Sequence, residues 1–325
     1  MQGPARRNPR HSLPPPAIEV TGGGGGPTPF SSNLKGILDF RALPNKSFDD
    51  LWNSIFLPLG HKDRLLAQAV LNFTARSKLQ AVSLPLHGVI LLVGPPGTGK
   101  TSLARGLASR TAAAVHGTFN YLEVEPHALA SAALGKSQQA VSHLLGTVIA
   151  EQAASGPCIV VLDEVETLAA NRSRMSMEAN PIDVHRATDA VLAQLDHLAT
   201  HTPHLLFIAT SNFVGAIDEA FASRADMIMT IGLPSAEMCE AILLDTLDRL
   251  AQVYPKLKRL RDNPRVREAA KHSLGLDGRR IRKAVLSALA LSKETAMDPS
   301  SLSPEAVYDS IELAQSERTR MEITK

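Results

Sequence analysis

The sequence predicts an α/β fold, in which a parallel sheet is flanked by helices and followed by a smaller helical domain. Short apolar runs alternate with helix-patterned stretches through most of the chain, an arrangement typical of parallel sheets with helices on both faces. A glycine-rich pattern of the phosphate-binding type lies between one apolar run and one helical stretch. After Pro234 the strand signals stop, and the remaining residues have a mostly helical pattern.

Composition and charge limit the binding partners and the cellular location that we expect for this chain. The chain has 325 residues, 44% of them apolar, and a formal net charge of +2. This balance gives no overall field that would attract nucleic acid or an anionic membrane. No apolar run reaches the roughly 18 residues needed to span a bilayer, and Cys158 and Cys239 are the two cysteines. We therefore expect reduced thiols and a cytoplasmic setting.

Three regions are expected. Residues 1–35 are rich in proline and glycine and predict a disordered tail; the arginines in this tail leave an organelle transit peptide as the alternative. Residues 36–234 are expected to form the α/β domain, with ordered structure beginning near Phe48. Residues 235–325 are expected to form a small helical domain.

The elements follow from hydrophobic periodicity. Apolar runs predict strands at residues 88–93, 119–124, 158–162, 205–209 and 227–231. Helical spacing predicts helices at residues 65–79, 103–114, 138–153 and 187–199.

The strongest motif matches the G-x-x-x-x-G-K-[ST] phosphate-binding loop in full. Its glycines allow backbone N–H groups to surround phosphate oxygens, and the following helix adds partial positive charge. Lys100 is expected to reach the β- and γ-phosphates, and the Thr101 hydroxyl to bind Mg²⁺. The motif consists of Gly94, Pro95, Pro96, Gly97, Thr98, Gly99, Lys100 and Thr101.

Two acids, Asp163 and Glu164, follow the predicted strand at residues 158–162. The carboxyl ends of parallel strands are where open α/β sheets bind ligands. Asp163 is expected to hold Mg²⁺ as a Walker B acid, and Glu164 to act as general base on the attacking water. The alternative is a pair of solvated loop acids, which the sequence order after the phosphate-binding loop makes less favourable.

Three further residues are candidates. Asn212, directly after the strand at 205–209, is favoured as a group that orients water or touches the γ-phosphate over a turn-forming Asn. Arg224 is interpreted as an arginine finger that acts on a neighbouring subunit, or as an ordinary salt-bridged arginine. Arg279 begins a predicted helix and either reaches the nucleotide or is an exposed basic residue.

Together these features resemble the AAA+ superfamily of P-loop NTPases, with its helical lid. Over residues 48–290 the chain is similar to the pachytene-checkpoint ATPases (the thyroid-receptor-interactor group). The likeness rests on the stretches Trp52–Ile55, Leu162–Leu168, Ala190–Asp196, Ala209–Asn212, Ser223–Asp226 and Gly278–Lys283.

The resemblance implies a homohexameric ATPase that uses ATP and Mg²⁺ to convert a HORMA-domain protein from its closed to its open form. It assigns Asn212 as sensor 1, Arg224 as the trans-acting finger and Arg279 as sensor 2. Compact members of the family occur in bacterial anti-phage operons with a HORMA protein and a cyclic-oligonucleotide synthase. There they disassemble the complex of those two proteins and keep signalling off. No membrane or nucleic-acid partner is expected.

The substrate pore loop is expected around Ala133, Leu134 and Gly135. The family has an aromatic residue where this chain has Ala133. An aromatic ring grips a threaded peptide through the area that it buries, so we expect limited remodelling rather than forceful threading. Two alternatives stay open: a general AAA+ unfoldase, and a nucleotide-dependent scaffold with little turnover.

Overall fold

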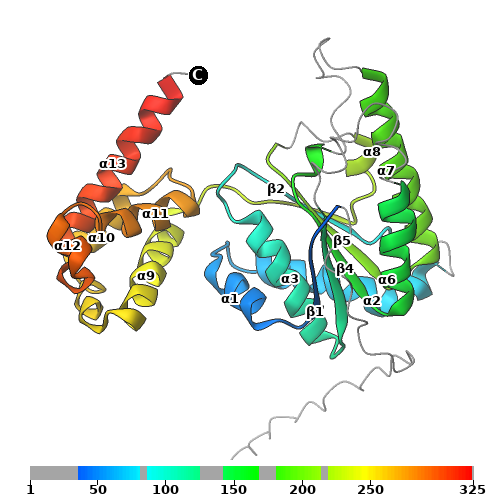
Figure 1. Cartoon of the computed structure of the whole chain (residues 1–325), viewed down its shortest axis with the longest axis horizontal. Coiled ribbons are helices and arrows are strands. Elements are labelled where there is room, and N and C mark those ends of the chain that lie inside the picture. The colour runs from blue at the N-terminus through cyan, green and yellow to red at the C-terminus, as the bar shows by residue number, and fades with distance from the viewer. Residues whose placement is uncertain (1–35, 81–85, 125–141, 168–180, 214–218, 324–325) are drawn as a thin grey trace, which may run out of the picture.

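The computed structural model describes residues 36–80, 86–124, 142–167, 181–213 and 219–323 (Figure 1). The expected tail at residues 1–35 and the expected pore loop with Ala133, Leu134 and Gly135 lie outside the described residues.

Six strands of the described residues form one sheet in the order β1-β3-β4-β5-β2-β6. β3, β4, β5, β2 and β6 run parallel to their neighbours, whereas β1 is an antiparallel edge strand beside β3. The sheet order differs from the chain order, as expected for strands joined by helical crossovers. The strands are β1 (Ile37–Leu43), β2 (Val89–Val93), β3 (Phe119–Val124), β4 (Cys158–Leu162), β5 (Leu205–Ser211) and β6 (Met227–Thr230).

The first strand corrects one expectation. Ordered structure was expected near Phe48, but β1 begins at Ile37. Phe48 lies instead inside the next helix, α1 (Lys46–Ser54), whose N-terminus is capped by the Asn45 side chain. Hydrogen bonds from the backbone N–H groups of Ser47 and Phe48 to Asn45 Oδ1 satisfy donors that a helix start otherwise leaves open.

Both faces of the sheet are buried under helices (Figure 1). Because side chains alternate along a strand, Leu91 of β2 packs in one apolar core and Ile90 in the other. The first core includes residues of η1, α6 and α7, and the second includes residues of α1, α2 and α3. The helices are α2 (His61–Gln80), α3 (Lys100–Ala114), the π-helical segment η1 (Leu144–Ile149), α6 (Ala150–Ser155), α7 (Pro181–His201) and the short α8 (Glu219–Ala222).

The part of the chain after the sheet, residues 236–323, is called the lid below. Its α-helices are α9 (Ala236–Val253), α10 (Pro264–His272), α11 (Gly278–Ala288), α12 (Lys293–Met297) and α13 (Pro304–Ile323), with short 3₁₀ segments at Pro255–Leu260 and Pro299–Ser301. The lid has an apolar core of its own, and Phe56 from the segment after α1 packs against it. The phosphate-binding loop therefore lies in a body with two cores of its own, beside a lid with a third.

Candidate functional site

The phosphate-binding loop connects β2 to α3, and its glycines fit where other residues would clash. A Cβ on Gly94 would lie 1.9 Å from the Ile231 carbonyl oxygen. Gly97 and Gly99 have φ angles of 84° and 91°, in the left-handed region that glycine tolerates best. Gly99 caps α3 without a side chain, so the N–H groups of the first turn point out of the helix toward the loop.

Lys100 is buried in this loop, with 6% of its surface exposed. Its Nζ donates to Gly94 O at 2.8 Å, to Pro95 O at 2.9 Å and to Asn212 Oδ1 at 3.0 Å. Burial lowers the pKa of Lys100, and nearby carboxylates oppose this shift. The ammonium group thus lies inside the loop, where phosphate oxygens would replace the two backbone acceptors.

Asp163 lies at the carboxyl end of β4 and accepts hydrogen bonds from two hydroxyl groups. Thr101 Oγ1 donates to Asp163 Oδ1 at 2.8 Å, and Thr210 Oγ1 donates to the same oxygen. Mg²⁺ prefers oxygen ligands and keeps several waters, and Thr101 and Asp163 supply such oxygens beside the loop. The structure therefore brings together Thr101 and Asp163, the two residues that the sequence predicts as Mg²⁺ ligands.

Glu164 has a φ of 52°, a left-handed conformation that costs free energy in a residue other than glycine. Its backbone N–H donates to Thr210 Oγ1 at 3.1 Å, and its carboxylate accepts from Asn212 Nδ2 at 3.2 Å. The bend turns the exposed Glu164 carboxylate toward the Asn212 amide. Asn212 therefore lies between Lys100 on one side and Glu164 on the other.

Arg224 donates to a side chain of α7 and to a backbone carbonyl of α8. Its Nε and Nη2 form a bidentate ion pair with Asp196 of α7, both at 2.6 Å, and its Nη1 donates to Ala220 O at 2.6 Å. This pairing lowers the pKa of Asp196. Arg224 is thus salt-bridged within the chain, and its finger role stays a prediction.

Arg279 lies where the lid meets the phosphate-binding loop. Asp277 caps α11 by accepting from the Arg280 N–H at 2.9 Å, and the Arg279 N–H donates to Gly97 O at 3.2 Å. A Cβ on Gly97 would lie 2.3 Å from the Asp277 carboxylate, so glycine is required for this close approach. The Arg279 charge also contributes to the lowered pKa of Lys100.

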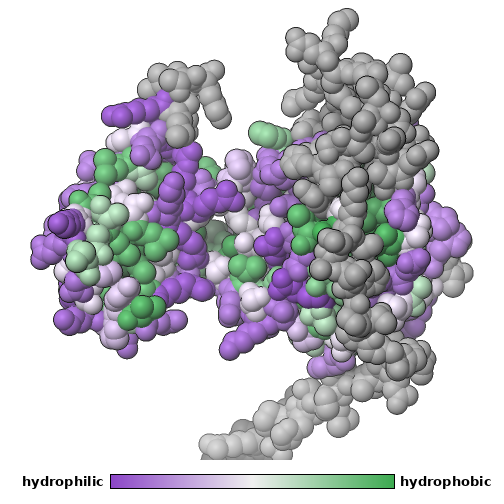
Figure 2. All heavy atoms as spheres, in the orientation of Figure 1, coloured by the Kyte–Doolittle hydropathy of each residue, from purple (hydrophilic) through white to green (hydrophobic). Residues whose placement is uncertain are grey.

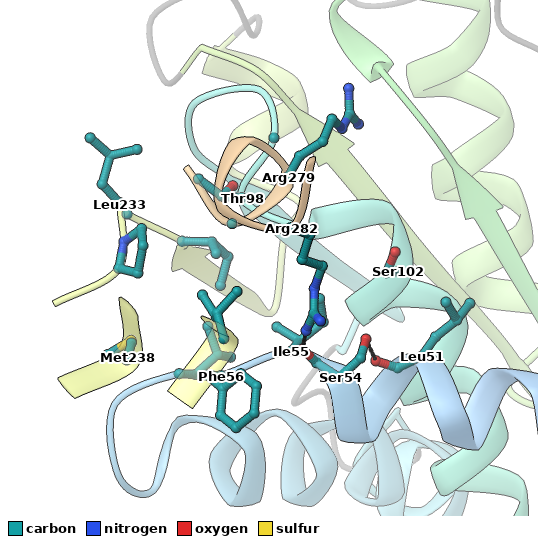
Figure 3. A pocket seen from close by; sticks show the side chains of 18 of the residues that line it. Leu51, Ser54, Ile55, Phe56, Thr98, Ser102, Leu233, Met238, Arg279 and Arg282 are labelled. Carbon is teal, nitrogen blue, oxygen red and sulfur yellow. Dashed lines mark hydrogen bonds between the residues drawn. The ribbon is translucent and has the colours of Figure 1, made fainter. Parts of the chain in front are cut away.

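Next to the loop is a cavity of about 660 Å³ between the α/β body and the lid (Figure 3). Its walls include Gly97 and Gly99 and are otherwise largely apolar. Ligand cavities of this size and lining are typical of nucleotide-sized molecules. The apolar lining includes Leu51, Ile55, Phe56, Leu57, Ile231, Leu233, Met238, Ile242 and Leu286.

Arg282 also lines this cavity and was not predicted as a site residue. Its Nη2 donates to Ser54 O at 2.7 Å, while Nη1 donates to Asp245 Oδ2 at 2.7 Å and to Thr246 Oγ1 at 3.0 Å. Figure 3 shows Arg282 reaching toward Ser54 and Arg279 pointing the other way. Since Asp245 and Thr246 belong to α9 and Ser54 ends α1, Arg282 ties the lid to the other wall of the cavity.

The site as a whole fits a nucleotide and Mg²⁺. The glycine loop leaves no room for a Cβ at Gly94 or Gly97, Lys100 supplies a cation, and Thr101 and Asp163 supply hard oxygen ligands. The apolar cavity beside Gly99 has the chemistry that a nucleoside needs.

Comparisons with known proteins give a consistent result. Residues 90–233 match the AAA family, "ATPase family associated with various cellular activities". "CD-NTase-associated protein 6" of Pseudomonas aeruginosa is 55% identical over 285 residues, which cover 87% of this chain and 94% of that protein. "Pachytene checkpoint protein 2 homolog" of Oryza sativa is 34% identical over 73% of this chain, and the match spans 51% of that longer protein.

Solved structures share the fold. The structure of C. elegans PCH-2 has a TM-score of 0.69 at 24% identity, covering 89% of this chain and 78% of that one. The E. coli MS115-1 HORMA:CdnC:Trip13 complex contains a chain with a TM-score of 0.66 at 17% identity, covering 86% and 95%. In the described part of the chain, no helix combines the length and apolarity that crossing a bilayer requires.

Proposed function

This chain belongs to the family of AAA ATPases that includes CD-NTase-associated protein 6, and on that premise we propose that it is an ATP-driven remodeller of HORMA-domain proteins. In this proposal it opens a HORMA protein, releases it from a cyclic-oligonucleotide synthase and so restrains anti-phage signalling. Two comparisons support the proposal. The 55% identical relative is named for its association with a CD-NTase, and the solved complex that shares this fold contains a HORMA protein.

One observation carries the enzymatic part. Asn212 accepts from Lys100 and donates to Glu164, so a cation for phosphate, a polar amide and a carboxylate base are connected in a single chain of hydrogen bonds. A binding-only site needs the cation and not the other two. The arrangement therefore favours hydrolysis over a scaffold with little turnover.

The geometry of the site supports the following proposed roles. Lys100 holds phosphate oxygens, and Thr101 and Asp163 would hold Mg²⁺, which when bound neutralises phosphate charge. Glu164 accepts the proton of the attacking water through a carboxylate oxygen. Asn212 donates through Nδ2 to this same carboxylate and thereby fixes the direction in which it points. The cavity beside Gly97 and Gly99 holds the nucleoside and excludes water from it.

The oligomeric part of the proposal is a homohexameric ring with Arg224 acting on the neighbouring subunit. The lid exposes large apolar side chains, and Figure 2 shows apolar side chains gathered on its visible face. Exposed apolar patches mark contact surfaces, which supports assembly through the lid. The exposed set of the lid that does not line the cavity is Val253, Leu274, Leu291, Met297 and Leu313.

The substrate loop at residues 131–137, with Ala133, Leu134 and Gly135, sets the scale of the proposed work. Without an aromatic residue at Ala133, the grip on a peptide depends on Leu134. We expect the release of one terminal segment rather than processive unfolding, which separates the proposal from a general AAA+ unfoldase.

The test is a purified mixture of this protein, ATP, a CdnC-type synthase and its HORMA partner. We expect the HORMA–synthase complex to dissociate on a sizing column and cyclic-oligonucleotide output to fall. Glu164→Gln is the matched control, because it keeps the phosphate-binding loop and should leave the complex intact. Hydrolysis of ATP with an intact complex and unchanged output would overturn the HORMA assignment, and unfolding of an unrelated tagged protein would support the general unfoldase.

A further inference from the structure

Glu166 is a third acid next to Asp163 and Glu164, and it has no part in the roles proposed for those two. It lies in the 3₁₀ turn Val165–Thr167 directly after Asp163 and Glu164. Val165 is fully buried in the apolar core, and it anchors this turn against the sheet. Leu162 of β4 pairs with Ala209 of β5, so the residues just beyond the two strand ends lie close together. Glu166 can therefore reach across to the segment after β5.

The Glu166 carboxylate contacts the backbone of Asn212. The Asn212 N–H donates to Glu166 Oε1 at 3.1 Å. With its backbone held by Glu166, Asn212 directs Oδ1 to Lys100 and Nδ2 to Glu164. One residue of the turn after β4 thus fixes the backbone from which the catalytic amide projects.

The other carboxylate oxygen of Glu166, Oε2, does not take part in the contact with the Asn212 backbone. Glu166 Oε2 is buried and has no hydrogen-bond partner among the described residues. A buried carboxylate oxygen without a donor costs free energy. Among the charges that oppose the burial-lowered pKa of Lys100, that of Glu166 is the strongest. The Glu166 carboxylate therefore acts on the Lys100 ammonium group as well as on the Asn212 backbone.

We propose that Glu166 is a positioning residue of the ATPase site, which holds the Asn212 backbone so that its amide lies between Lys100 and Glu164. The inference rests on the ATPase part of the proposed function and is independent of the protein substrate. Glu166 does not touch the reacting atoms in this role; it acts through Asn212.

The experiment compares Glu166→Ala, Glu166→Gln, Asn212→Ala and the double variant Glu166→Ala/Asn212→Ala in the full chain. Glu151→Ala, an exposed acid of α6, is the matched control. A displaced catalytic group costs on the order of 10²-fold in rate, so Glu166→Ala should lower kcat by about 10- to 100-fold with little change in KM for ATP. Because both residues act through one amide, the double variant should be no slower than the slower single variant. Glu166→Gln keeps an oxygen for the Asn212 N–H and should recover most of kcat.

A second readout does not require activity. Hydrogen exchange of the peptide containing Asn212 should speed up in Glu166→Ala and stay slow in Glu166→Gln and Glu151→Ala. The proposal is overturned if exchange at Asn212 is unchanged in Glu166→Ala, or if the losses of the two single variants multiply in the double variant. A parent protein that hydrolyses no ATP would refute the proposed function instead, while the exchange result would still decide the role of Glu166.

Discussion

Replacing Arg282 tests whether the lid and the α/β body close the cavity as one unit. Arg282→Ala removes the hydrogen bond to Ser54 O at 2.7 Å, which joins the two walls, and the ion pair with Asp245 inside the lid. A hydrogen bond from a charged group contributes about 1.5–3 kcal/mol. The Arg282 side chain is 26% exposed, so the lower end applies. In Arg282→Ala the bound nucleotide has to hold the two walls together without this hydrogen bond. The free energy of ATP binding should then be less favourable by about 1.5 kcal/mol, which corresponds to a roughly tenfold weaker affinity.

Arg249→Ala is the control for Arg282→Ala, because Arg249 pairs with the same Asp245 carboxylate at 3.0 Å within α9. Its side chain is 46% exposed, and exposed pairs of this spacing contribute only about 0.3–0.5 kcal/mol. Titration of a fluorescent ATP analogue should therefore show a clear loss for Arg282→Ala and almost none for Arg249→Ala. Equal affinities for the two variants would refute the coupling between the walls.

Three further predictions address the base, the finger and the buried core. Glu164→Gln should bind ATP like the parent but hydrolyse it about 10²–10⁴-fold more slowly, since a general base contributes that much. Nucleotide titration measures the affinity and a phosphate-release assay measures the rate. Unchanged turnover would exclude Glu164 as the base. Arg224→Ala and Lys100→Ala should each be inactive, but mixed rings should regain part of the ATPase rate if Arg224 acts in trans; no recovery at any ratio, with mixed rings verified by differential tags, would contradict it. Arg76→Met should lower the free energy of unfolding by roughly 2 kcal/mol or more in urea denaturation, because the backbone carbonyls of Leu86 and Ala199 lose the Arg76 donor at about 1–3 kcal/mol each, whereas the Leu205 carbonyl keeps Asn72 Nδ2. The exposed Arg64→Met in the same helix serves as the control for Arg76→Met and should change stability little.

The parts of the fold that were predictable are those whose local pattern and tertiary environment agree. β4 was predicted at its observed bounds because each of its residues is buried and the strand is an unbroken apolar run before two acids. β1 was missed because Asp39 and Arg41 interrupt its apolar residues, and these two charges pair with each other at 2.6 Å on an edge strand. The helix predicted from residue 103 begins at Lys100, since the phosphate-binding loop itself provides the first turn.

Some residues of the candidate site were predictable from local motifs, and others were not. Lys100, Thr101, Asp163, Glu164 and Asn212 belong to motifs that lie at strand ends, so their order along the chain predicts that they meet. The apolar cavity was not predictable, because its walls come from segments that are far apart in sequence, from Leu51 to Leu286. Arg282 was missed for a related reason: in the sequence it is one of several basic residues that begin a helix, and only Ser54 O gives it a specific role.

The contact between Gly97 and α11 has a consequence for how this protein can be controlled. The Arg279 backbone N–H donates to the Gly97 carbonyl, so truncating a side chain leaves this hydrogen bond in place. The Asp277 carboxylate occupies the space where a Cβ on Gly97 would lie. Adding a single methyl group at Gly97 would instead act as a wedge between the phosphate-binding loop and α11. A small molecule seated in the adjoining cavity would contact both sides of this junction, because Gly97 and Gly278 both line that cavity.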